Sequence, residues 1–131
     1  MNAVDRLLKA IGYPLDEVLS EGESVVLKVD GREVRVRELR GRLVLSLSLG
    51  TPSDEGLRQL AAFAMGRMLR EEAVLAWDPE RRELILWQSV PATATDDLMR
   101  RVFEVFSASC DWWADRGEET VETIPEAMIR P

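Results

Sequence analysis

Residues 55–73 have the sequence of a helix with more apolar surface than one chain of this size can cover. The six consecutive residues 60–65 are all apolar. A surface helix needs an apolar stripe only about 100° wide to pack against its own core. Because this helix is apolar nearly all round, it must be covered on a second side, and in a chain of 131 residues a second copy is the simplest cover. The sequence therefore predicts a homodimer that associates through this central helix.

Small residues on the same helix favour the close approach of another element. Ala61, Ala62 and Ala64 carry short side chains, and Gly66 lies inside the helical pattern although glycine costs about 1 kcal/mol relative to alanine there. Close packing against a partner would offset this cost. We therefore expect a dimer interface made by five residues of the helix and one of the next strand: Leu60, Ala61, Phe63, Ala64, Met68 and Trp77.

The rest of the chain predicts two further helices and five strands. The first helix covers residues 3–11, where one helical face is formed by Val4, Leu7, Leu8 and Ile11. A short turn follows at 15–19. Alternating apolar residues predict strands at 25–29, 34–38, 43–49, 74–77 and 83–90, and a last helix follows Thr95. The order αβββαββα predicts the α+β class, as a two-layer sandwich with helices on one side of a twisted antiparallel sheet.

Turn and cap residues set the predicted boundaries. Asp30-Gly31 and Arg40-Gly41 are typical of tight hairpin turns, in which both central residues favour a positive φ. Thr51 is expected to cap the central helix, with Pro52 at its first position. Thr95 is expected to cap the last helix.

The last helix is predicted to face inward with Leu98, Val102, Val105, Phe106, Ser109 and Trp113. Met99, Phe103 and Trp112 widen this stripe. Beyond Gly117 the chain is acidic and has few apolar residues. We therefore expect one domain at 1–116 and an acidic C-terminal tail at 117–131.

The residue types argue against an enzyme. The chain has no histidine, so the usual general base and the commonest metal ligand are missing, and Cys110 is its only cysteine. Carboxylates near turns, such as Asp78 and Asp96, fit loop and cap positions better than a catalytic pair. Phosphate-binding glycine motifs are absent from the sequence. We expect no catalytic residue, metal, cofactor or small-molecule substrate.

Charge and hydropathy limit the possible partners. The net charge of −7 disfavours nucleic acid, although four arginines lie close together and are expected on the solvated face of two strands: Arg35, Arg37, Arg40 and Arg42. No apolar run approaches the roughly 20 residues of a membrane helix, and the N-terminus does not resemble a secretory signal. With a single cysteine, these features favour the cytoplasm.

Several apolar residues allow either core packing or partner binding. Trp87 and Trp113 are expected in the core, whereas Trp77 and Trp112 could equally lie at an interface. Residues 84–87 are four apolar residues in a row, which suggests burial on both faces of the sheet. An open sheet edge beside an amphipathic helix can also accept a foreign peptide as an added strand.

The segment AWDPERRELILWQ at residues 76–88 resembles the strand–DP–strand hairpin of class I type III secretion chaperones, the Tir-chaperone family. The last helix, which ends in Asp111-Trp112-Trp113, is also similar. The chain's size, acidic balance, element order and apolar central helix agree with this family. The resemblance covers about residues 1–115.

This resemblance implies a cytoplasmic bacterial homodimer without ATPase activity. Such a chaperone binds the extended N-terminal segment of a secreted effector, keeps it competent for secretion and aids its delivery to the export apparatus. By position, the implied effector-binding residues are Val4, Leu7, Leu8, Ile11, Val44 and Ile85. The alternative is a regulatory or adaptor protein of the same fold that binds a transcription-control partner.

Overall fold

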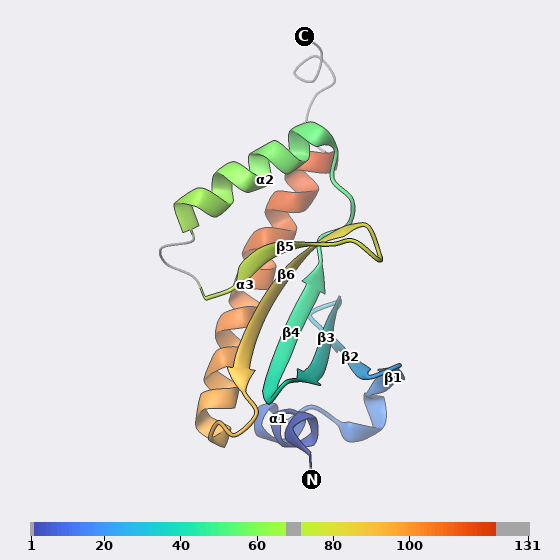
Figure 1. Cartoon of the computed structure of the whole chain (residues 1–131), viewed down its shortest axis with the longest axis vertical. Coiled ribbons are helices and arrows are strands. Elements are labelled where there is room, and N and C mark those ends of the chain that lie inside the picture. Colours follow the sequence, from blue (N-terminus) through green and yellow to red (C-terminus); the bar gives the residue numbers. More distant parts are fainter. Residues whose placement is uncertain (1, 68–71, 123–131) are drawn as a thin grey trace.

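The computed structural model describes residues 2–67 and 72–122, which form three α-helices, one short 3-10 helix and six strands (Figure 1). The helices are α1 (Ala3–Ile11), η1 (Leu15–Glu17), α2 (Asp54–Arg67) and α3 (Asp96–Glu122). The strands are β1 (Leu19–Glu21), β2 (Ser24–Val29), β3 (Arg32–Leu39), β4 (Arg42–Ser48), β5 (Val74–Asp78) and β6 (Glu83–Pro91). The predicted α+β class is confirmed, and the three-residue β1 is an addition that the sequence did not indicate.

All neighbouring strands are antiparallel, in the order β1-β2-β3-β4-β6-β5. Both predicted hairpin turns are confirmed, because Asp30 and Gly31 have φ of 52° and 78°, and Arg40 and Gly41 have φ of 52° and 79°. Turns with two positive φ values match the right-handed twist of the strands that they join. The dipeptides therefore fix the register of β2, β3 and β4.

The core lies on one face of the sheet, which we call the inner face. Alternate residues of β3, β4 and β6 are buried there, among them Val36, Leu45 and Leu86. Helices α1 and α3 contact each other and pack on this face (Figure 1). The opposite face, which we call the outer face, carries the intervening residues of the same strands.

Helix α3 packs largely through the residues predicted to face inward, because Val102, Phe106, Ser109 and Trp113 are buried. Leu98 and Val105, expected to face inward, are 41% and 42% exposed, whereas Met99 and Phe103 are buried. The buried face is therefore shifted from the predicted one toward Met99 and Phe103, which the sequence placed at the border of the inward stripe. It also continues through Gly117, the expected start of the tail, to Glu122.

Helix α2 begins and ends differently from the prediction. Its first turn is capped by Ser53, whose Oγ accepts a hydrogen bond from the Gly56 N–H at 3.0 Å. The Thr51 hydroxyl, expected to be the cap, instead donates to the Arg82 carbonyl at 2.8 Å. The described part of the helix ends at Arg67, and Ala73 lies outside any helix next to β5. The expected helix end at residue 73 is therefore wrong.

Burial controls the chemistry of Cys110. The side chain lies in the core, and desolvation raises the pKa of its thiol to about 12. A raised pKa keeps the thiol protonated at neutral pH, and only the thiolate is reactive. We expect iodoacetamide to leave the native protein unmodified at pH 8 and to alkylate it once in guanidinium chloride, as measured by intact mass. Rapid labelling of the folded protein would contradict this packing.

Candidate binding surfaces

The surface of α2 that faces away from the core carries an apolar stripe beside charged residues such as Arg58. Leu57, Ala61 and Met65, spaced four residues apart, form a stripe that we call the α2 stripe, and Leu57 and Met65 are 41% and 79% exposed. The inward side of the same helix buries Leu60 completely, and the Phe63 ring packs edge-on against Trp112 at 5.8 Å. The helix therefore carries apolar residues on two sides, and in the part of the chain that the structure describes the α2 stripe is the exposed one.

The edge strand β5 adds further exposed apolar surface. Trp77 is 49% exposed and Val74 is exposed as well, although β5 pairs with β6 along its other side. Of the predicted dimer residues, Ala61 and Trp77 are therefore accessible, Phe63 and Ala64 are half-buried, and Leu60 lies in the core. Met68 lies outside the described residues.

A first groove, which we call the α1 groove, lies between the end of α1, the β2–β3 turn and α3. Its volume is about 680 Å³, and its apolar lining includes Ile11, Tyr13 and Phe103. Of the α1 residues predicted to bind an effector, Ile11 lines this groove and Val4 is half-buried against the core. The other two, Leu7 and Leu8, are fully buried and offer no surface to a partner.

A second groove, which we call the outer groove, lies on the outer face of the sheet and has a volume of about 470 Å³. Val44 from β4 and Ile85 from β6, both predicted to bind an effector, line this groove together with Trp87. Trp87 was expected in the core, but it is only half-buried and faces this groove. Ile11, the one predicted α1 residue that lines a groove, is therefore separated from the predicted strand residues, which line another.

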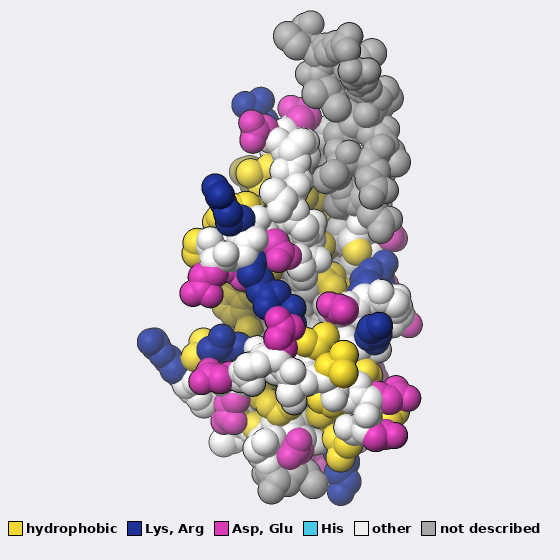
Figure 2. Space-filling view, turned by 90° about the vertical axis from the view of Figure 1, so that its right-hand side faces the viewer, with side chains coloured by type: hydrophobic (Ala, Val, Ile, Leu, Met, Phe, Trp, Pro, Cys, Tyr) yellow, Lys and Arg dark blue, Asp and Glu magenta, His cyan; other side chains and the backbone are white. Residues whose placement is uncertain are grey.

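Charged side chains border the outer groove, and three of them form an ion-pair cluster. The Glu21 carboxylate accepts hydrogen bonds from Arg35 at 2.7 Å and from Arg81 at 2.8 Å. These hydrogen bonds, that of Arg35 first, lower the pKa of the Glu21 carboxyl, so it is ionised at neutral pH. Figure 2 shows the side of the molecule that carries β1 and the β5–β6 turn, which is the right-hand side of Figure 1. Basic side chains lie beside acidic ones on this side.

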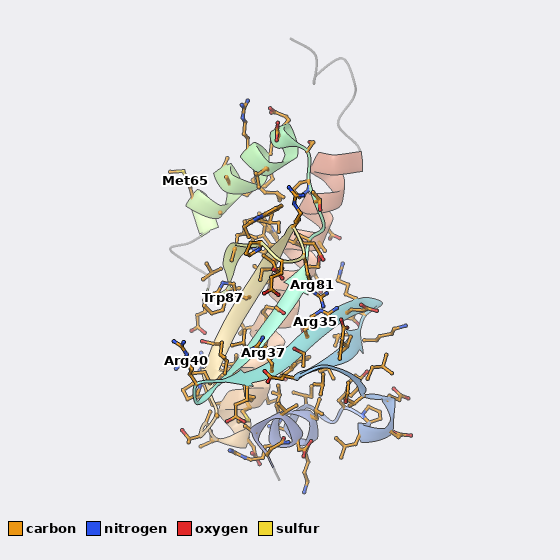
Figure 3. All side chains as sticks on the ribbon, turned by 45° about the vertical axis from the view of Figure 1, so that its right-hand side comes forward. Arg35, Arg37, Arg40, Met65, Arg81 and Trp87 are labelled. Carbon is orange, nitrogen blue, oxygen red and sulfur yellow. The ribbon has the colours of Figure 1, made fainter. Side chains whose placement is uncertain are left out.

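The cluster joins the two ends of the sheet. Glu21 lies on the edge strand β1, whereas Arg81 lies in the β5–β6 turn at the opposite end of the strand order. Their contact requires a strongly twisted sheet, whose outer face then becomes concave. Figure 3 shows the labelled Arg81, Arg35 and Arg37 following one another across this face.

Sequence reasoning named Val44 and Ile85 as binding residues and placed Arg35 and Arg37 on a solvated strand face, but it expected Trp87 in the core and did not predict the ion pairs of Glu21. The period of two along β6 places Trp87 on the same face as Ile85, so that signal was present. No local signal pairs Glu21 with Arg81, because their contact depends on the twist of the whole sheet.

None of the helices in the described part of the chain is both long enough and apolar enough to cross a membrane. Within residues 2–67 and 72–122, no group of three or more potential metal ligands comes together.

Solved structures share this fold at low sequence identity. The structure of the HopA1-SchA chaperone–effector complex has a TM-score of 0.65 and 16% identity, and the match covers 86% of this chain and 91% of that one. The ExsC–ExsE complex has a TM-score of 0.63 and 22% identity, with the same coverage. The Yersinia pestis type III secretion chaperone SycH, in complex with a fragment of YscM2, has a TM-score of 0.60 and 14% identity, with 84% and 95% covered.

Among curated proteins, none matches this chain in sequence. The Tir chaperone protein (CesT) family, by contrast, matches residues 2–114, which include every described strand and most of α3. This match confirms the resemblance drawn from residues 76–88 and from the last helix. The chain belongs to the Tir chaperone protein (CesT) family.

Proposed function

We propose that this protein is a cytoplasmic, ATP-independent chaperone that, as a homodimer, binds the extended N-terminal segment of a type III secreted effector. It keeps that segment competent for secretion and aids its delivery to the export apparatus. The observation that carries the proposal is the family match over residues 2–114. The two apolar-lined grooves, which can receive side chains of an extended chain, support it.

The proposed dimer interface lies on α2 and β5. Ala61, Phe63, Ala64, Met68 and Trp77 meet the partner, and Leu60 supports the helix from within. The exposed α2 stripe and the exposed Trp77 support this arrangement, because apolar surface gains about 25 cal/mol for each Å² that is removed from water. An edge strand such as β5 also has unpaired backbone groups that a second copy can satisfy.

The proposed client site uses both grooves. Ordering an extended segment costs roughly 1–2 kcal/mol per residue in backbone entropy. Each buried apolar anchor contributes about 1.5–3 kcal/mol, so a long segment needs several anchors. Ile11 and Val4 supply contacts on one side, Val44 and Ile85 supply them in the outer groove, and the buried Leu7 and Leu8 hold α1 in place.

Removing an anchor should release the client. The protein is purified from its own host, and the bound chain is identified by mass spectrometry, with the N-terminal segment of a secreted protein as the expected result. Ile11→Asp and Ile85→Asp should each weaken that complex by roughly tenfold or more, because one apolar anchor is lost and a charge is introduced.

Val105→Asp is the matched control, since Val105 is an exposed valine on α3 that lines neither groove. It should bind like the wild type. Co-purification with a transcriptional regulator, or with no chain at all, would overturn the proposed function.

A further inference from the structure

The Glu21 side chain is held at the outer groove by hydrogen bonds from two arginines, Arg35 and Arg81. Glu21 lies on β1, a strand of three exposed residues, and its own side chain is about half exposed. Arg35 and Arg81 reach it from different elements, at 2.7 Å and 2.8 Å. Exposed ion pairs of this kind contribute little to stability, so the carboxylate can be exchanged for another at small cost.

Two other acidic side chains, those of Asp78 and Glu80, line the same groove. Asp78 accepts hydrogen bonds from the backbone N–H groups of Glu80 and Arg81 and so stabilises the β5–β6 turn. Arg37, also in the lining, has a buried Nε with no hydrogen-bond partner and approaches Glu23 only at 3.8 Å. Once Glu21 moves aside, the groove presents guanidinium groups next to an apolar lining, in a protein whose net charge is −7.

We infer that Glu21 occupies the place of a client carboxylate, and that the outer groove selects client segments in which an acidic side chain lies next to an apolar one. The apolar side chain packs against Val44, Ile85 and Trp87, while the carboxylate replaces Glu21 between Arg35 and Arg81. In an extended chain, residues two apart point to the same face about 7 Å from each other, so alternate positions supply both groups. This inference rests on the proposed function and adds the chemistry of the segment that is bound.

The test uses a fluorescein-labelled peptide in which every second residue is serine. Leucine and glutamate take turns at the positions between the serines. Counterparts carry glutamine or lysine in place of glutamate. Fluorescence anisotropy should show that the full-length wild-type protein binds the glutamate peptide roughly two- to fivefold more tightly than the glutamine peptide, the range expected for exposed ion pairs. The lysine peptide should bind most weakly.

Two variants should move this preference in opposite directions. Glu21→Gln removes the internal competitor and should tighten binding of the glutamate peptide by a further two- to fivefold. Arg35→Gln combined with Arg81→Gln should abolish the preference for glutamate over glutamine. Glu33→Gln is the control, because Glu33 is an exposed carboxylate on β3 that does not line the groove, and it should change nothing.

Equal binding of the glutamate and glutamine peptides, or weaker binding by Glu21→Gln, would overturn the inference, since Glu21 would then serve only to hold β1. Binding of a single-stranded oligonucleotide that the two arginine substitutions abolish would also overturn it, because the groove would then attract phosphate. If the arginine double variant retains the co-purified client at wild-type affinity, the inference fails while the proposed function stands.

Discussion

Ala61→Asp is expected to convert the proposed dimer into a folded monomer. Ala61 lies at the centre of the exposed α2 stripe, between Leu57 and Met65, and is itself exposed in the single chain. The substitution therefore leaves the monomer's core intact, but it places an unpaired carboxylate in the proposed interface. An unpaired charge in such a site costs several kcal/mol, so the dimer dissociation constant should rise by roughly a hundredfold or more. Light scattering at micromolar concentration measures the change in mass.

Ala108→Asp provides a matched control, because Ala108 is an exposed alanine on another helix, α3, and lies outside the proposed interface. It should keep the mass of the dimer. If Ala61→Asp also keeps that mass, the dimer does not associate through the α2 stripe. A wild-type protein that is a monomer under the same conditions would remove the dimer from the proposed function.

Local signals predicted most of the fold because their physical causes are local. Asp30-Gly31 and Arg40-Gly41 fix two hairpins through their own backbone angles. Thr95 was predicted to cap α3, and its Oγ1 does accept a hydrogen bond from the Leu98 N–H at 3.2 Å. The cap of α2 was misplaced by two residues because Thr51 and Ser53 can both act as caps, and the contact with Arg82 that engages Thr51 depends on a distant turn.

The residues that line the binding surfaces were predicted only in part. Val44 and Ile85 were chosen by position from the family resemblance, and the structure brings them into one groove. The same reasoning could not distinguish Leu7 and Leu8, which are buried, from Ile11 on the same helix, because all three fit one apolar stripe. Where that stripe is covered depends on how α1 packs against α3, which is a tertiary property.

The inward face of α3 was predicted only in part, and two neighbouring residues of the predicted face, Val105 and Phe106, test where the buried surface lies. Phe106 is fully buried and packs in the core, whereas Val105, the next residue back, is 42% exposed. Phe106→Ala is expected to lower the free energy of unfolding by about 3–5 kcal/mol, because a large apolar ring is lost and a cavity remains. Val105→Ala should lower it by less than about 1 kcal/mol, since most surface substitutions have small effects.

Denaturant unfolding followed by circular dichroism measures both free energies. All variants must be compared at one protein concentration, because the proposed dimer formation would add a concentration-dependent contribution to stability. Should Phe106→Ala be too unstable to purify, Phe106→Leu gives a smaller cavity and should still destabilise the protein more than Val105→Ala does. Equal losses at positions 105 and 106 would mean that α3 meets the sheet through the row that starts at Leu98. The outer groove would be unaffected by that outcome, but the α1 groove, which Phe103 helps to line, would then have a different shape.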